Sequence, residues 1–268
     1  MREYRNFIDG EWVDAISGET VDTVNPSTQD IVSRVPKSAP EDVRRAVAAA
    51  RRAFDEGEWP QMPVERRVEC MRDVANRIMA KAMELGGIES EEAGQTIRLA
   101  TLSMAGAVGL AQQLCTQMST LPEVEPLPFN SFPSVSWNLA AYEPYGVCGQ
   151  ITPWNYPFMM AVWKLFPALL TGNCVVMKPA SNTPSTTLEL ARITEEAGIP
   201  KGVVNVVAGP GGSVGEEICT SGGVDKIAFT GSTEVGRRIM QLASGTIKKV
   251  TLELGGKSPN ILLEDADL

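Results

Sequence analysis

Two glycine-rich stretches in the second half of the chain have the composition of an anion-binding loop. Residues 211–215 (GGSVG) and 231–236 (GSTEVG) place glycine and hydroxyl side chains where helices are predicted to begin. Free backbone N–H groups and the helix dipole favour a negatively charged group there, such as a pyrophosphate. Neither stretch is a true GxGxxG motif, so a glycine-tightened turn is the alternative for each.

Glu253 is a side chain that could move a proton. It lies between Leu252 and Leu254, directly before Gly255-Gly256-Lys257. Partial burial between two leucines would disfavour the charged carboxylate and raise its pKa toward the range useful to a general base. The alternative is an outward-facing residue on an alternating strand.

The elements that must position these residues alternate between strand and helix after Tyr145. Helices are predicted to start near Pro157, Pro184, Ser213 and Ser232. Short apolar strands, typical of a parallel sheet covered on both faces, are predicted at Val147–Ile151, Cys174–Met177, Val203–Val207, Lys226–Phe229 and Lys249–Leu252. We therefore predict an α/β fold with a doubly wound, Rossmann-like parallel sheet and a ligand site at the carboxyl ends of its strands.

The first half of the chain is predicted to be a hairpin and helical region. Turn residues between short β-rich pieces indicate hairpins in residues 6–35, and Ser38 is expected to cap a helix that starts at Pro40. Two further helices are predicted at Val64–Leu85 and Glu89–Met118. Prolines then interrupt the helical pattern, and Ser134–Tyr142 is predicted to be a projecting strand that pairs with another part of the protein.

Composition excludes several classes of function. A net charge of −9 and a pI near 4.8 argue against binding of nucleic acid or an anionic membrane. The chain has no histidine, which excludes Ser-His-Asp and Cys-His catalysis and histidine-based metal sites, and we predict no metal. Five scattered cysteines, without a leader or an apolar run of membrane-spanning length, predict reduced thiols in a cytoplasmic protein.

The motifs PWNYP, KPA, FTGSTEVG and LELGGKSPN occur in this order, and together they resemble the NAD(P)-dependent aldehyde dehydrogenase superfamily over essentially the whole chain. The resemblance implies that Asn155 stabilises an oxyanion and that Glu253 activates water. For Asn155 the alternative is a turn-capping residue before Pro157. The implied reaction oxidises an aldehyde to a carboxylic acid, with NAD or NADP as acceptor.

The resemblance also assigns residues to the ligands. Lys178 is expected to contact the cofactor ribose, while Ser181 replaces a glutamate that is typical of NAD-preferring members, which predicts tolerance of NADP. The expected cofactor-binding residues are Ile151, Thr152, Pro153, Trp154, Lys178, Ser181, Gly211, Gly215, Phe229, Thr230, Gly231, Ser232, Val235 and Leu254. The expected wall of an apolar substrate tunnel comprises Tyr156, Met159, Met160 and Trp163. Ordinary core packing is the alternative for each tunnel residue.

By the same resemblance the chain is expected to be truncated before its catalytic cysteine, because none of the fifteen residues after Glu253 is Cys. Residues 1–123 and 143–254 are expected to form the dinucleotide-binding domain, 124–142 an oligomerisation arm, and 255–268 the start of a catalytic domain. The expected partners are a small aldehyde and, in a completed protein, further copies of the chain. The alternatives are a non-catalytic NAD(P)-binding module, a partner subunit of a longer homologue, or a non-functional gene remnant.

Overall fold

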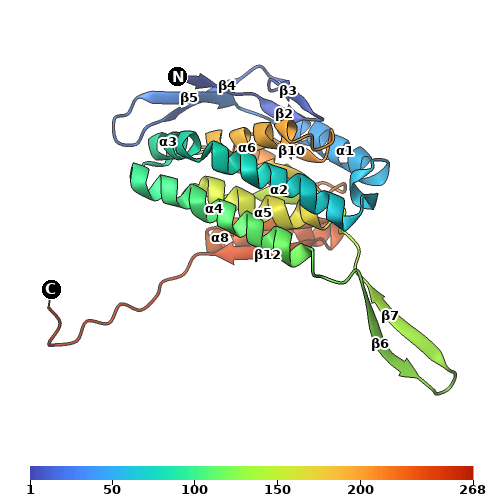
Figure 1. The fold of residues 1–268 in the computed structure, drawn as a ribbon. Coiled ribbons are helices and arrows are strands. Elements are labelled where there is room, and N and C mark those ends of the chain that lie inside the picture. Colours follow the sequence, from blue (N-terminus) through green and yellow to red (C-terminus); the bar gives the residue numbers. More distant parts are fainter. Residues whose placement is uncertain (268) are drawn as a thin grey trace.

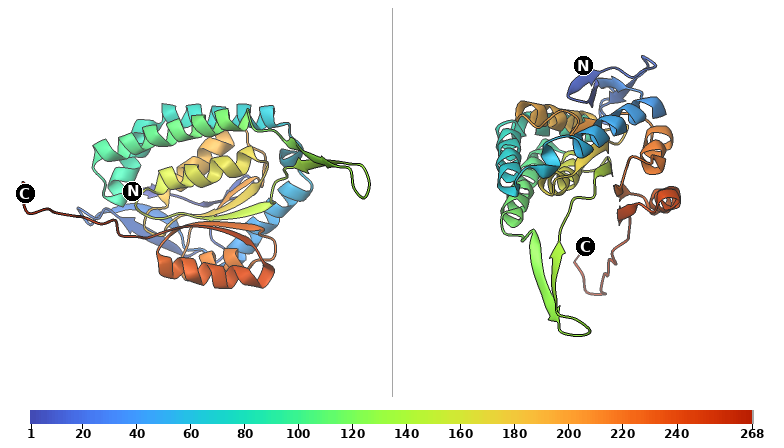
Figure 2. Two further views of the ribbon diagram at one scale, coloured as in Figure 1. Left: turned by 90° about the horizontal axis from the view of Figure 1, so that it is seen from below. Right: turned by 90° about the vertical axis from the view of Figure 1, so that its right-hand side faces the viewer.

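The computed structural model describes residues 1–267. A central sheet is covered by helices on both faces, with two helical layers on one side and one on the other (Figures 1 and 2). The inner helices of the double layer are α5 (Pro157–Leu170) and α6 (Ser185–Glu196), and the outer ones are α2 (Val64–Ala80), α3 (Ala82–Ala93) and α4 (Ile97–Met118). The opposite face carries α1 (Pro40–Asp55), α7 (Glu216–Thr220) and α8 (Thr233–Ala243). The predicted fold class is confirmed.

The central sheet has seven strands in the order β12-β11-β8-β9-β10-β2-β3. Its parallel part consists of β8 (Val147–Ile151), β9 (Cys174–Lys178), β10 (Val204–Val206), β11 (Lys226–Gly231) and β12 (Lys249–Leu254). Every residue of β8, β9 and β10 is buried, which explains their continuous apolar sequences. β12 is an edge strand, and its residues alternate between exposed and half-buried.

The N-terminal hairpin extends this sheet. β2 (Asn6–Ile8) pairs antiparallel with β10, and β3 (Glu11–Val13) forms the other edge. A separate three-stranded sheet is formed by β1 (Arg2–Glu3), β4 (Thr20–Val24) and β5 (Ile31–Pro36).

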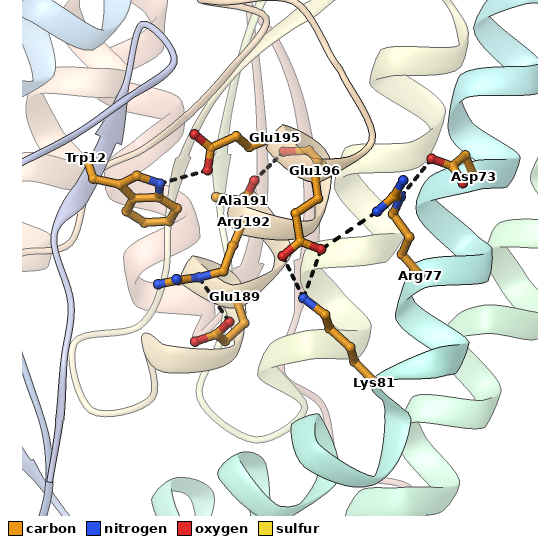
Figure 3. Close-up of polar contacts among 10 residues, drawn as sticks. Trp12, Asp73, Arg77, Lys81, Glu189, Ala191, Arg192, Glu195 and Glu196 are labelled. Carbon is orange, nitrogen blue, oxygen red and sulfur yellow. Dashed lines mark hydrogen bonds and ion pairs between the residues drawn. The ribbon is translucent and has the colours of Figure 1, made fainter.

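Charged side chains of α6 join the N-terminal hairpin to the outer helices (Figure 3). Trp12 Nε1 donates a 2.8 Å hydrogen bond to Glu195, and the Arg192 guanidinium lies 5.1 Å from the centre of the Trp12 ring. On the other side of the helix, Glu196 accepts hydrogen bonds of 2.8 and 2.9 Å from Lys81 at the end of α2. These contacts hold the edge hairpin against the helix that follows β9.

The outer helices differ from the prediction at their boundaries. The structure has three helices where two were predicted, because breaks fall at Lys81 and at Gly94 and none falls between Leu85 and Glu89. Gly94 adopts the left-handed conformation (φ 72°) that ends α3. Gly86, by contrast, is needed where α3 approaches α4: an added Cβ would lie 3.1 Å from Thr101 Oγ1.

One prediction in the neighbouring N-terminal region is also wrong. Ser38 does not cap α1: the N-cap is Ala39, whose N–H donates 3.0 Å to Asp42, while Ser38 Oγ accepts from Asn6. The proline-rich stretch, for which only the end of the helix was predicted, forms β6 (Val124–Asn130), which pairs with β7 (Ser136–Ala141). Proline is tolerated there because both strands of the isolated hairpin are edges.

The β6–β7 hairpin projects from the body of the molecule (Figures 1 and 2). Its side chains are exposed, including Trp137 at 89% and Phe132 at 85%. Residues 255–267 also leave the body, without helix or strand. Within residues 1–267, no helix combines the length and apolar character that would be needed to cross a membrane.

Candidate functional site

The predicted site residues lie at the carboxyl ends of the parallel strands and on the loops and helices that follow them. β8 leads into residues 152–156, β9 into 179–184, β10 into 207–210, and β11 into the start of α8. The stretch 211–215 forms one π-helical turn before the five residues of α7, so the predicted helix near Ser213 is shorter and less regular than expected. Ser232 caps α8, with its Oγ accepting from Val235 N at 3.3 Å.

A cavity of about 290 Å³ gathers six of the predicted cofactor residues, at the ends of β8, β9 and β11 and the starts of α7 and α8. These are Ile151, Lys178, Gly211, Gly215, Phe229 and Val235. Two of its glycines leave room: a Cβ added at Gly211 or Gly212 would meet nothing within 4 Å in the described chain. The cavity therefore has an open glycine-rich wall beside helical N-termini, which fits a dinucleotide phosphate.

Lys178 is almost wholly buried at the inner end of this cavity. It is 3% exposed, and its Nζ donates a 2.7 Å hydrogen bond to the carbonyl of Pro179. Burial lowers the pKa of Lys178 to about 8.

Ser181 lies apart from Lys178, at a second cavity of about 170 Å³ that Lys37 and Gly209 also line. Its Oγ donates a 3.0 Å hydrogen bond to the carbonyl of Gly209. The lysine that lines the Ser181 cavity is therefore Lys37 and not Lys178, and Lys37 is itself paired with Glu19 at 2.9 Å.

A third cavity, of about 630 Å³, lies between α5 and the β11–β12 edge of the sheet. It brings Glu253 and Thr230 together with the predicted tunnel residues Met160 and Trp163. Its walls are largely apolar, with Phe229 separating it from the 290 Å³ cavity and lining both.

Glu253 is exposed on β12, so the expected burial between Leu252 and Leu254 is not found. The physical reason is the position of β12 at the sheet edge: the two leucines turn toward the half-buried face, and Leu254 packs on Gly236. Glu253 lies on the opposite side of the strand from the two leucines and faces the open 630 Å³ cavity.

The remaining predicted residues lie around these cavities and do not line them. Asn155, Trp154 and Tyr156 are exposed on the loop after β8, and the N-cap position of α5 is held by Tyr156 and not by Asn155. Met159 turns away toward α4, where its Cε approaches Gly106, so core packing describes it better than a tunnel wall. Thr152 is buried and its N–H donates to the carbonyl of Lys178, Pro153 is half-buried, and Gly231 packs beneath the Phe229 ring.

Sequence reasoning missed Lys164, which lies on α5 beside Glu253. Its Nζ donates a 2.6 Å hydrogen bond to Thr230 Oγ1, and both residues line the 630 Å³ cavity. Burial lowers the pKa of Lys164 to about 8, against the opposing effect of the Glu253 charge. The feature of the sequence that could have identified Lys164 is that it is the single charged residue in the otherwise apolar α5.

The cysteines do not supply a nucleophile. Cys148 and Cys219 line cavities but are 3% and 0% exposed, and burial raises the pKa of each thiol to about 12. Cys174 is buried in β9 in the same way. No disulfide forms among the five cysteines; Cys70 is half-buried, and the other four are buried as structural thiols usually are.

Comparison with known proteins decides the family. The profile of the aldehyde dehydrogenase family matches residues 12–268. The chain belongs to the aldehyde dehydrogenase family. It is 43% identical over 98% of its length to betaine aldehyde dehydrogenase of Bacillus subtilis, and equally to human mitochondrial aldehyde dehydrogenase, of which it covers 53% and 50%.

Solved aldehyde dehydrogenases share the fold. The NAD⁺ complex of betaine aldehyde dehydrogenase from Staphylococcus aureus superposes with a TM-score of 0.93 at 38% identity, over 98% of this chain and 52% of that one. An NAD-dependent aldehyde dehydrogenase from Sinorhizobium meliloti gives 0.93 at 42% identity, over 99% and 52%. This chain thus spans about half the length of the family members it matches.

Proposed function

We propose that this chain forms the dinucleotide-binding and water-activating part of an NAD(P)-dependent aldehyde dehydrogenase. The observation that carries the proposal is a pair of cavities on opposite faces of the sheet that share Phe229 of β11 in their lining. One has the glycine-rich wall that suits a dinucleotide, and the other is an open, largely apolar cavity that Glu253 faces and that suits an aldehyde. Betaine aldehyde dehydrogenase and its NAD-dependent relatives support NAD as the cofactor.

In the proposed reaction each group of residues has its own role. Backbone N–H groups around Gly211–Gly215 and the cap of α8 hold the dinucleotide, which accepts a hydride when bound. The Asn155 amide donates to the developing oxyanion from the loop after β8. Glu253 takes a proton from water, and Lys164 and Thr230 supply polar groups on the opposite wall. The thiol nucleophile of this chemistry is none of the chain's five cysteines, which all precede Glu253.

The same proposal divides the chain into parts. Residues 1–123 and 143–254 form the dinucleotide-binding domain, 124–142 an oligomerisation arm, and 255–268 the beginning of the catalytic domain. The exposed aromatic side chains of the β6–β7 hairpin support self-association through that arm. The free cysteines support a reducing compartment such as the cytosol.

Calorimetric titration of the purified chain with NAD⁺ tests the proposal. We expect saturable binding of one dinucleotide per chain and no NADH when an aldehyde is added. Absence of binding would overturn the dinucleotide assignment. Aldehyde-dependent NADH formation by the chain alone would show that one of its own thiols is the nucleophile, contrary to their burial.

Ser181 extends the proposal to NADP. Without a carboxylate at this position, nothing there repels a 2′-phosphate, and the Ser181 cavity is also lined by Lys37. We expect NAD⁺ and NADP⁺ to bind with dissociation constants within about tenfold of each other, a difference of about 1.4 kcal/mol. NAD⁺ binding that is tighter by more than this would contradict NADP tolerance and leave the NAD assignment intact.

A non-catalytic dinucleotide-binding module, or a partner subunit of a longer homologue, is the second candidate function. The absence of an accessible thiol near Glu253 among the described residues favours it. It shares the binding result above but predicts that any aldehyde oxidation in a native assembly comes from the longer homologue and none from this chain.

A further inference from the structure

One short stretch of chain, residues 89–95, contacts both loops that carry the proposed site. Glu89 Oε2 accepts a 3.0 Å hydrogen bond from Phe158 N, in the first turn of α5. Glu92 Oε2 accepts one of 3.0 Å from Ser185 N, in the first turn of α6. The Gln95 side chain donates to the carbonyl of Asn155. The Asn155 loop leads into α5 and the Ser181 loop leads into α6, so a single helix end fixes the start of both.

The two carboxylates act as helix caps supplied from a distant part of the sequence. The N-cap residues of α5 and α6 are Tyr156 and Pro184, and neither side chain makes a capping bond within the described chain. Free N–H groups at a helix start need acceptors, and a negative charge is favoured there. Glu89 and Glu92, one turn apart on α3 and only 0% and 5% exposed, meet that need.

The two caps differ in how fully they are satisfied. Glu92 also accepts from the hydroxyls of Ser185, Thr23 and Ser33 at 2.7 to 3.0 Å, so both of its carboxylate oxygens have partners. Glu89 Oε1 and Ser103 Oγ are buried without a hydrogen-bond partner in residues 1–267. A buried carboxylate with a spare oxygen is costly to a core, so stability alone does not account for it.

We propose that Glu89 is a positioning residue for Asn155. Glu89 holds the Phe158 amide while Gln95 holds the Asn155 carbonyl, so the loop is fixed at Asn155 and just after it, which sets where the Asn155 side-chain amide lies. Glu92 does the same for the loop of Ser181, and α3 thereby fixes the spacing of the two loops. This inference rests on the roles proposed above for Asn155 and Ser181.

Glu89 offers a spectroscopic signature of the contact. Burial raises the pKa of Glu89 to about 7, opposed by the hydrogen bond from Phe158 N and by the nearby Ser103 hydroxyl, and reinforced by the charge of Glu92. The carboxylate is therefore protonated on going from about pH 8 to about pH 6 in the folded protein. The chemical shift of the Phe158 amide proton should follow that titration, since its acceptor changes charge.

The test is a pH series of ¹⁵N–¹H spectra of the full chain, as wild type, Glu89→Gln, Glu89→Leu and the control Glu91→Gln. Glu91 lies on the same helix but is exposed and paired with Arg2. In the wild type and the control we expect the Phe158 amide to titrate near pH 7. In Glu89→Gln it should stop titrating, while the Asn155 backbone and side-chain signals stay near their wild-type positions because the glutamine oxygen still accepts. In Glu89→Leu the Asn155 signals should move well beyond their shift in the control.

Two results would overturn the proposal: a Phe158 amide signal whose position and pH dependence are unchanged in Glu89→Gln; and Asn155 signals that move no further in Glu89→Leu than in the control. If Glu89→Leu fails to fold, the Glu89→Gln comparison decides alone. Dinucleotide titration of the wild type tests the proposed function separately, so the two failures are distinguishable.

Discussion

Lys164 on α5 and Thr230 at the end of β11 are joined by a 2.6 Å hydrogen bond that closes one side of the cavity holding Glu253. The bond connects an inner helix to the strand next to the sheet edge. It places an ammonium group within an apolar enclosure, where the charged form is disfavoured.

The first prediction concerns the pH dependence that Lys164 brings to folding. Its folded-state pKa of about 8 lies below the unfolded value near 10.5. Between these values the unfolded chain holds a proton that the folded chain has lost, so stability contributed by this group rises with pH. Relative to Lys164→Met, the wild type should gain about 1–2 kcal/mol in the free energy of unfolding from pH 7 to pH 9.5.

Urea unfolding of both proteins at the two pH values measures this gain. Lys257→Met is the matched control, because Lys257 is exposed and should leave the pH profile unchanged. Parallel profiles for the wild type and Lys164→Met would show that Lys164 is solvated and charged throughout.

The second prediction distinguishes the effect of Gly215→Ala on cofactor binding from its effect on folding stability. An added Cβ would make ordinary contacts, 3.6 Å from Lys178 Cδ and 3.9 Å from Ile151 Cδ1, within the proposed dinucleotide cavity. Since Gly215 has helical backbone angles, Gly215→Ala should keep or raise stability, by up to about 1 kcal/mol. It should nevertheless weaken NAD⁺ binding by about tenfold, because the methyl group occupies the glycine wall.

Gly109→Ala on α4 is the control for that experiment. Gly109 lies in an exposed helix interior with nothing within 4 Å of an added Cβ in the described chain. It should raise the melting temperature similarly and leave NAD⁺ binding unchanged. Unaltered binding in Gly215→Ala would remove Gly215 from the cofactor site.

Much of the fold was readable from the sequence because its strands are buried on both faces. The continuous apolar runs of β8 and β9 fixed their position to within one residue, and Pro157 and Ser232 marked the starts of α5 and α8. The helix boundaries around α3 were predicted wrongly because the sequence does not distinguish a glycine that ends a helix from one that permits a close approach. Gly94 ends a helix, whereas Gly86 makes room for α4.

The site was less predictable because it depends on which side chains face a common space. Six of the cofactor residues predicted from the motifs line one cavity, but the spacing of the motifs could not show that Ser181 lies at another. Glu253 was expected to be buried from its leucine neighbours alone, while its exposure follows from the edge position of β12. Lys164 had no motif, and only the packing of α5 against β11 brings it to Glu253.

The third prediction tests the role of Ser181. Ser181→Glu places a carboxylate at the cavity shared with Lys37 and Gly209. Repulsion of the 2′-phosphate should weaken NADP⁺ binding by about tenfold or more while NAD⁺ binding changes less. Thr120→Glu, which adds the same charge just past the end of α4, should alter neither. Equal losses for the two dinucleotides would indicate a general disturbance of the loop and not discrimination at the ribose.

The fourth prediction concerns the projecting hairpin. Trp137 on β7 is 89% exposed and shares the arm with other exposed apolar side chains, a pattern that favours association with another surface. Sedimentation over a range of concentrations should show self-association of the wild type that Trp137→Ser reduces. Met83→Ser on α3, which removes another exposed apolar side chain (69%), should not reduce it. A wild type that stays monomeric at all concentrations, or associates equally as Trp137→Ser, would rule out the arm as the interface between copies of this chain.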